Sequence, residues 1–256
     1  MNDPALPLGA ELERIAGSGF DFADITLEPP AAWPITGREL SRLLSQTGLR
    51  AVGHTAYYLP IASHFPQLRA AAHASFRDLL DTFAEAGITE VNVHPDPMTK
   101  LVSRDTVAQR NAEAIAELAE VAAARGQRLM VENLGTIGRV EDLRPIFAAA
   151  PSVGLHLDVA HANLLRLAGE PNRTVELLAA FGDRLLHVHV SDNFGVEDLH
   201  LPLGAGSIDW PVVIAALKRA RWDGTVTIEI FTSQPAHLET SRRLWLEWWR
   251  AADERL

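Results

Sequence analysis

The chain has 256 residues, 47% of them hydrophobic and 22% charged, so it is long enough for one large domain with a substantial core. It contains no cysteine, which excludes disulfide bonds and thiolate metal ligands. Its formal net charge of −10 disfavours a general nucleic-acid binder, whose surface is usually basic. No apolar run is long enough to cross a bilayer, and the first residues lack the pattern of a signal peptide. We therefore expect a cytoplasmic protein with no membrane partner.

Helical and strand-like segments alternate along the whole chain. Apolar periodicity and terminal signals predict helices over residues 10–16, 38–46, 65–86, 99–125, 142–150, 173–181, 208–221 and 235–252. Alternating or β-branched runs predict strands over residues 20–28, 50–58, 90–95, 128–134, 154–160, 186–190 and 224–231. The connections are short and no change of composition marks a linker, so we expect a single domain over residues 1–256.

Strict alternation of strand and helix over about 250 residues gives either an open doubly wound sheet or an α/β fold of the (β/α)8 TIM-barrel type. No glycine-rich dinucleotide-binding fingerprint follows the first strand, and this removes the commonest reason to predict the open sheet. We also expect no organic cofactor. Polar residues at many strand ends favour the barrel, because a closed ring brings those ends together. Only seven strands are convincing, since prolines at positions 4 and 7 disfavour a strand over residues 5–8. We predict a barrel whose first strand is vestigial or absent.

Residues that can bind metals stand at or near six predicted strand ends. They are His54, His94, Glu132, Asp158, His189 and Glu229, with His161, Asp198 and His200 just beyond strand ends. One such histidine alone is more often a hydrogen-bonded core residue, but acidic groups buried together repel one another unless a cation neutralises them. Carboxylates and imidazoles together suit Zn²⁺ or Mn²⁺, with Co²⁺ and Mg²⁺ as further candidates. The sequence therefore predicts a divalent-metal site at the strand ends.

Seven short motifs occur at these strand ends in a characteristic order. They read GHTAYYLP, VNVHPD, VENLG, HLDVAHA, HVHVSD, DLHLPLGAGSIDW and TIEI. Over residues 20–231 the chain resembles the xylose-isomerase-like TIM-barrel superfamily. That superfamily holds sugar isomerases and epimerases together with the endonuclease IV branch of DNA-repair enzymes.

The resemblance implies roles for particular residues. Those matching the four ligands of the single metal in isomerases and epimerases are Glu132, Asp158, His189 and Glu229. The further ligands of endonuclease IV members match His54, His94, His161, Asp198 and His200, which in isomerase-like members may instead serve substrate hydroxyls. We expect His156 and His187 to lie one layer deeper, as supporting or core residues. Trp33 is either a sugar-stacking residue or a loop anchor.

Two functions are compatible with these residues. In the first, which we favour, a metal polarises a carbonyl of a sugar or sugar phosphate while Glu132 and Glu229 remove and return a proton. Hydride-shift isomerases of the superfamily commonly use a site lysine, and no strand-end lysine exists here. In the alternative, a metal cluster hydrolyses phosphodiesters in abasic DNA, but the acidic charge and the scarcity of lysine make a nucleic-acid partner unfavourable. A barrel that binds metal without catalysis is a third, weaker possibility.

The chain ends in a tryptophan-rich segment whose partner the sequence leaves open. Trp245, Trp248 and Trp249 lie at helical spacing. We expect them to pack against the barrel wall, with contact to a second subunit of a homo-oligomer as the alternative.

Overall fold

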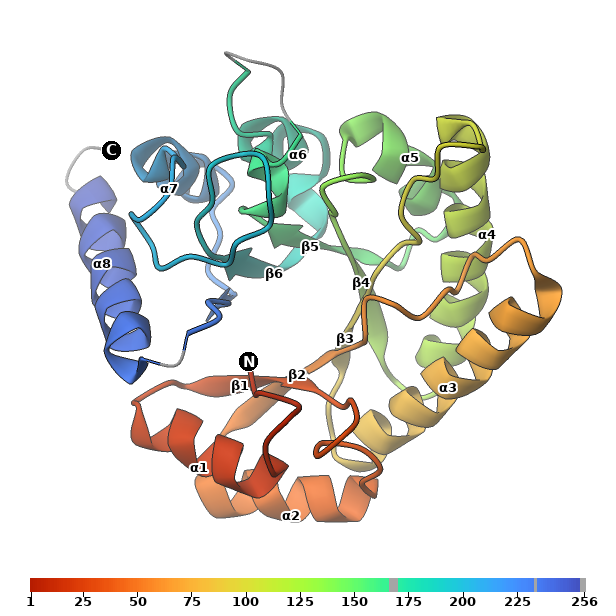
Figure 1. The fold of residues 1–256 in the computed structure, drawn as a ribbon, viewed down its shortest axis with the longest axis horizontal. Helices are drawn as coiled ribbons and strands as arrows, with labels where there is room; N and C mark the ends of the chain where they lie inside the picture. Colours follow the sequence, from red (N-terminus) through yellow and green to blue (C-terminus); the bar gives the residue numbers. More distant parts are fainter. Residues whose placement is uncertain (166–169, 233, 254–256) are drawn as a thin grey trace. The chain divides into compact units, whose positions relative to one another are not determined.

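The structure is a computed structural model that describes residues 1–165, 170–232 and 234–253. Helices and strands alternate along the chain (Figure 1). The strands are β1 (Phe22–Thr26), β2 (Arg50–His54), β3 (Glu90–Val93), β4 (Arg128–Glu132), β5 (Gly154–Asp158), β6 (Leu185–Val190) and β7 (Thr225–Ile228). The helices are α1 (Leu8–Gly17), α2 (Gly37–Thr47), α3 (Pro66–Glu85), α4 (Arg104–Ala123), α5 (Val140–Ala149), α6 (Thr174–Phe181), α7 (Trp210–Arg219) and α8 (Pro235–Asp253). The predicted order of elements is therefore confirmed over the described residues.

Local signals in the sequence set where several helices begin and end. The Thr36 hydroxyl accepts a hydrogen bond from the Glu39 amide at the start of α2, and Asp209 accepts one from the Val212 amide at the start of α7. After α2 the chain turns at Gly48, whose φ of 71° lies in the left-handed region that favours glycine. These caps explain why the predicted and observed helices agree closely there.

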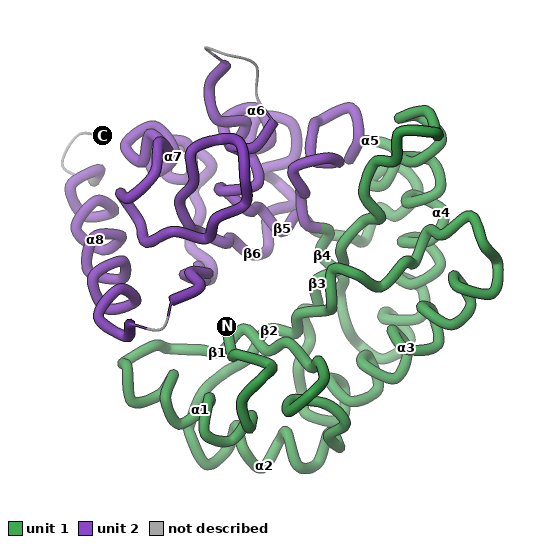
Figure 2. The backbone as a smooth tube through the Cα atoms, in the orientation of Figure 1, with its two compact units in different colours: residues 1–131, 144–154 green, residues 132–143, 155–256 purple. Residues whose placement is uncertain are grey.

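The chain forms two compact units, coloured separately in Figure 2. Unit 1 comprises residues 1–131 and 144–154, and unit 2 comprises residues 132–143 and 155–256. In unit 1 the strands β1 to β4 pair in parallel with their sequence neighbours, and Thr26 lies opposite His54 in the register. Helix α3 packs closely on β2, since a Cβ at Gly53 would lie 3.0 Å from the ring of Phe83. The carboxyl end of β2 is thereby held firmly in place.

In unit 2 the strands β5, β6 and β7 also pair in parallel and in sequence order. Asp158 lies opposite His189, and Val190 lies opposite Ile228. The three strands therefore end at about the same level, which brings the residues at their carboxyl ends together. This register is the structural basis of the candidate site.

The tryptophans of α7 and α8 pack against one another inside unit 2. The ring of Trp210 stacks on that of Trp248, and Trp245 stacks on Trp249, with centroid separations of 5.8 and 5.6 Å. Lys218 places its ammonium 4.0 Å from the centroid of Trp249. Packing within the fold, as expected, thus accounts for this aromatic segment.

No strand precedes α1 in residues 1–9, as predicted from the prolines. Asn2 instead satisfies backbone groups of β1. Its amide donates to the Asp24 carbonyl at 3.3 Å, while its side chain accepts from the Thr26 amide at 2.9 Å and donates to the Thr26 carbonyl at 3.1 Å. One asparagine thus satisfies backbone groups that a neighbouring strand would otherwise bind.

Within the described residues, every helix is too short or too polar to span a bilayer.

Candidate metal centre

The four residues predicted to bind one metal all belong to unit 2. Glu132 and Asp158 are the last residues of β4 and β5, His189 lies near the end of β6, and Glu229 follows β7. Their exposed fractions are 1%, 0%, 0% and 6%. Buried carboxylates and imidazoles at this density need partners that compensate for lost hydration.

Asp158 is held by its backbone while one of its carboxylate oxygens has no donor. Its amide donates to Asn133 Oδ1 and its carbonyl accepts from Asn133 Nδ2, both at 2.8 Å. Oδ1 accepts from the His161 amide at 2.7 Å, whereas the buried Oδ2 accepts no hydrogen bond from the described residues. An unpaired buried carboxylate oxygen is a suitable ligand for a cation.

His189 connects Asp158 and Glu229. Its Nδ1 lies 3.0 Å from Glu229 Oε2 and 4.0 Å from Asp158 Oδ2. Glu132 Oε1 lies 3.2 Å from His161 Nδ1, which is 3.7 Å from Asp158 Oδ2. The ligand atoms therefore form a continuous buried cluster.

The acidity of these groups reflects their crowding. Burial and the carboxylates of Glu132 and Glu229 raise the pKa of Asp158, while His161 and His189 lower it, and the net result is a pKa of about 6. Burial also acts to raise the pKa of Glu229, but His189 and His200 outweigh it and hold that pKa below its ordinary value. A divalent cation would relieve the repulsion between these carboxylates, so the donor set fits such an ion.

A second cluster adjoins the first. Asp198 Oδ2 lies 2.9 Å from His161 Nε2 and 3.1 Å from His200 Nε2. Nδ1 of His161 faces the Asn133 carbonyl, and Nδ1 of His200 faces the Glu229 carbonyl, each at 3.0 Å. A carbonyl partner fixes the proton on Nδ1 in both rings, so both Nε2 atoms are directed at the same carboxylate.

Electrostatics in this second cluster favour charged side chains. Although burial opposes the charge, the hydrogen bond to Asp198 and the nearby carboxylates raise the pKa of His200 to about 9. They also raise the pKa of His161 well above its usual range. Burial would raise the pKa of Asp198, but its two histidine partners lower it overall. Without a metal, these shifts favour an ionised Asp198 carboxylate between two protonated imidazoles.

His156 and His187 are buried in unit 2. His156 Nδ1 is 3.5 Å from Glu132 Oε2, and its ring meets His189 edge-on at 4.1 Å between centroids. His187 lies within hydrogen-bond distance of the hydroxyls of Thr225 and Thr227, at 2.6 and 3.0 Å. The supporting role assigned to these two histidines stays a prediction.

The remaining candidates belong to unit 1. His54 ends β2 and His94 follows β3; both are buried and their ring centroids are 4.9 Å apart. The Asn92 side-chain amide lies 3.3 Å from His94 Nε2. Trp33 lies half-buried in the loop after β1. The roles assigned to these three residues remain predictions.

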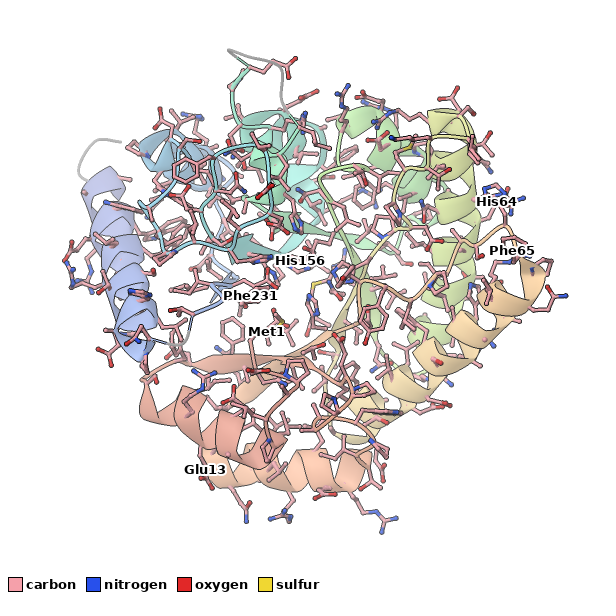
Figure 3. All side chains as sticks on the ribbon, in the orientation of Figure 1. Met1, Glu13, His64, Phe65, His156 and Phe231 are labelled. Atoms are coloured by element: carbon pink, nitrogen blue, oxygen red, sulfur yellow. The ribbon has the colours of Figure 1, made fainter. Side chains whose placement is uncertain are left out.

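Two residues of the site were not found from the sequence. Phe231, which follows β7 in the chain and is labelled in Figure 3, stacks on the His200 ring with 4.0 Å between centroids. Asn133 fixes Asp158 and contacts His161, as described above. Their positions beside predicted ligands, two residues after Glu229 and one after Glu132, were the available signal.

Comparison with known proteins agrees with this architecture. A model of the xylose isomerase-like TIM barrel family matches residues 12–252. The chain belongs to this family. A crystal structure of a D-tagatose 3-epimerase-like protein superposes with a TM-score of 0.85 at 28% identity, covering 97% of this chain and 96% of that one. The predicted TIM barrel is therefore confirmed.

The relatives include proteins of two functional groups. The chain is 27% identical to an L-ribulose 3-epimerase from Methylomonas, over 93% of this chain and 84% of the relative. It is also 27% identical to a probable endonuclease 4 from Mycobacterium leprae, over 79% of this chain and 82% of the relative. The two functions considered from the sequence are thus both found among relatives.

Proposed function

We propose that this protein is a metal-dependent ketose epimerase that inverts a carbon next to the carbonyl by proton transfer. The observation that carries the proposal is the buried cluster of Glu132, Asp158, His189 and Glu229, in which Asp158 Oδ2 accepts no hydrogen bond from the part of the chain that the structure describes. The epimerases among the relatives support the reaction class.

The chemistry divides between the metal and the side chains. A bound Zn²⁺ or Mn²⁺ would be held by Glu132, Asp158, His189 and Glu229, and would polarise the substrate carbonyl and so acidify the adjacent C–H. Glu229, whose pKa is held low, is ionised at neutral pH and is suited to accept a proton. Glu132, in its protonated form, would deliver a different proton to the opposite face of the carbon and so invert its configuration. Proton exchange with solvent would then return both carboxyl groups to their starting states.

The second cluster contributes to substrate binding in this scheme. His161 and His200 carry protons on nitrogens directed toward the Asp198 side, so together with that carboxylate they offer donors and an acceptor to sugar hydroxyls. The two lysines of the chain do not supply an alternative route. Lys218 places its ammonium over the ring of Trp249, and neither lysine stands at a strand end. Proton transfer by carboxylates is therefore the scheme that these residues support.

A nuclease function is the second candidate, and one observation favours it. Two Nε2 atoms and one carboxylate oxygen converge in the His161, Asp198 and His200 cluster, while carbonyls fix both Nδ1 protons. That arrangement suits a further zinc ion with an open coordination position. The charge of −10 and the scarcity of lysine weigh against DNA as its substrate.

One parallel assay separates the two functions. The purified protein is stripped of metal, reloaded with Zn²⁺ or Mn²⁺, and given a panel of ketoses and a DNA duplex containing an abasic site. We expect 3-epimerisation of at least one ketose that depends on added metal, and no efficient DNA cleavage. Cleavage that is lost in Asp198→Asn and His200→Ala, without sugar turnover, would replace the epimerase proposal with the nuclease.

A further inference from the structure

The loop between β6 and α7 supplies Asp198 and His200, but a different residue holds it in place. Asp192 is fully buried at the start of this loop and directs both carboxylate oxygens into it. Oδ1 accepts from the amides of Asn193 and Ile208 at 3.0 and 3.2 Å. Oδ2 accepts from the Gly204 amide and from Trp210 Nε1, both at 2.9 Å. One side chain thus fixes both ends of the loop.

The backbone of Asp192 fixes the middle of the same loop. Its amide and carbonyl exchange two 2.9 Å hydrogen bonds with Leu201, the residue after His200. His200 itself has a φ of 44°, a left-handed conformation that is unfavourable for a residue with a side chain. The Leu201 bonds are therefore part of what keeps His200 in this conformation.

The loop backbone passes so close to Asp192 that one position accepts only glycine. A Cβ at Gly206 would overlap Asp192 Oδ1 and the Asn193 carbonyl oxygen. The atoms nearest to such a Cβ all belong to Asp192 and Asn193, so the close approach involves the same carboxylate that binds the loop. A methyl group at this position would separate the loop from the carboxylate without changing Asp192.

We call the four hydrogen bonds accepted by the Asp192 side chain the Asp192 clamp, and this clamp requires a carboxylate. Four N–H donors meet its two oxygens, which is the full acceptor capacity of the group. An asparagine has one acceptor oxygen, so it would retain two of the four bonds and place its own amide hydrogens against the other two donors. Buried donors left in this way are costly, and the loop is expected to open.

We propose that Asp192 is a positioning residue that holds residues 193–208 in place and thereby delivers Asp198 and His200 to His161. The four side-chain hydrogen bonds of Asp192 join it to the loop and to Trp210, so it acts on Asp198 and His200 through the loop. Its effect on turnover rests on the proposed epimerase function, whereas its effect on the loop does not.

Hydrogen exchange tests the loop without reference to activity. In Asp192→Asn and in Gly206→Ala, peptides covering residues 193–208 should exchange at least about 10-fold faster than in the wild type, because the amides of Gly204 and Ile208 lose their acceptor. Peptides from α3 and α4 should be unchanged. Trp210→Phe, which removes one of the four bonds and keeps an aromatic ring, is the matched control and should change exchange less. Unaltered protection of the loop in both variants would overturn the proposal.

A double-mutant cycle tests the route of action. We expect Asp192→Asn to lower kcat/KM roughly 10- to 100-fold while Mn²⁺ uptake at the Glu132 site is retained. Adding Asp192→Asn to the variant Asp198→Ala/His200→Ala should cost little more than that variant alone, because Asp192 acts through both residues. Independent, multiplying effects would contradict positioning through Asp198 and His200. If wild-type protein turns over no ketose, the proposed function fails, and the exchange experiment still decides the role of Asp192.

Discussion

His189 on β6 and Glu229 after β7 are joined by a 3.0 Å contact between Nδ1 and Oε2. Parallel pairing of the two strands, with Val190 opposite Ile228, sets this contact. The same contact holds the pKa of Glu229 below its ordinary value, although burial acts in the opposite direction. Sheet register thus determines both the position and the ionisation of a proposed catalytic carboxylate.

Metal binding should depend on the first cluster. The double variant Glu132→Gln and His189→Ala removes one charged and one neutral ligand, so we expect it to lose stoichiometric Zn²⁺ or Mn²⁺. Elemental analysis after removal of free metal measures this directly. Glu117→Gln, a change at an exposed carboxylate of unit 1, is the control and should keep the metal. A double variant that retained one metal per chain would refute the ligand assignment.

Asn133 should contribute to metal affinity without being a ligand. Asn133→Ala removes the two 2.8 Å hydrogen bonds that hold the Asp158 backbone, and it leaves the buried backbone amide of Asp158 without an acceptor. We expect Mn²⁺ affinity to fall roughly 10- to 100-fold, the usual consequence of removing a group that orients a ligand. Titration calorimetry gives the affinity, and circular dichroism checks that the variant is folded. Wild-type affinity in a folded variant would show that Asn133 does not orient Asp158.

The second cluster should hold substrate and no additional metal. The epimerase proposal predicts one tightly bound divalent ion in unit 2, with the same stoichiometry there in Asp198→Asn. Asp198→Asn should instead raise KM for the ketose, because it weakens the hydrogen bonds that residue 198 makes with His161 and His200. Loss of a second bound metal in Asp198→Asn would favour the nuclease.

Acid sensitivity of unit 1 should depend in part on Glu11. Burial would raise its pKa, but hydrogen bonds from Arg14 and the Asp3 amide outweigh this and lower it below its ordinary value of 4.5. A lowered pKa in the folded state stabilises the fold above pH 4.5, and this stabilisation is lost as the pH falls through the folded pKa. Glu11→Gln should lose about 1–2 kcal/mol at pH 7, after allowance for the partly exposed Arg14, and less at low pH.

Urea unfolding at pH 7 and at pH 3 measures this difference. Glu13→Gln changes an exposed carboxylate on the same helix, labelled in Figure 3, and serves as the control. Equal losses for Glu11→Gln at both pH values would contradict the assignment.

Strand and helix boundaries show where sequence patterns are sufficient. The strand predicted over residues 50–58 ends at His54, because the Thr55 amide turns away to Asn92 Oδ1 at 2.8 Å. The helix predicted over residues 99–125 begins only at Arg104, where Ser103 caps it. Both differences come from side-chain contacts to the backbone, which apolar periodicity does not record.

In the candidate site too, the sequence predicted some residues, while others became apparent only in the folded structure. Glu132, Asp158, His189 and Glu229 were predictable because parallel strands place their carboxyl ends together and the motifs stand at those ends. The Asp192 clamp was not, because its donors at positions 193, 204, 208 and 210 are brought together only by the folded loop. The Asn133 pairing with the Asp158 backbone likewise depends on the three-dimensional meeting of two strand ends.

The central claim is proton transfer at a carbon next to a metal-polarised carbonyl. Its most direct test is turnover of a ketose in deuterated water by the Mn²⁺-loaded protein, with the product examined by NMR and mass spectrometry. The account predicts one deuterium at the inverted carbon of the product, because the proton removed by one carboxylate is replaced by a deuteron from the other carboxyl group, which exchanges with solvent. Inverted product without solvent deuterium would contradict that account.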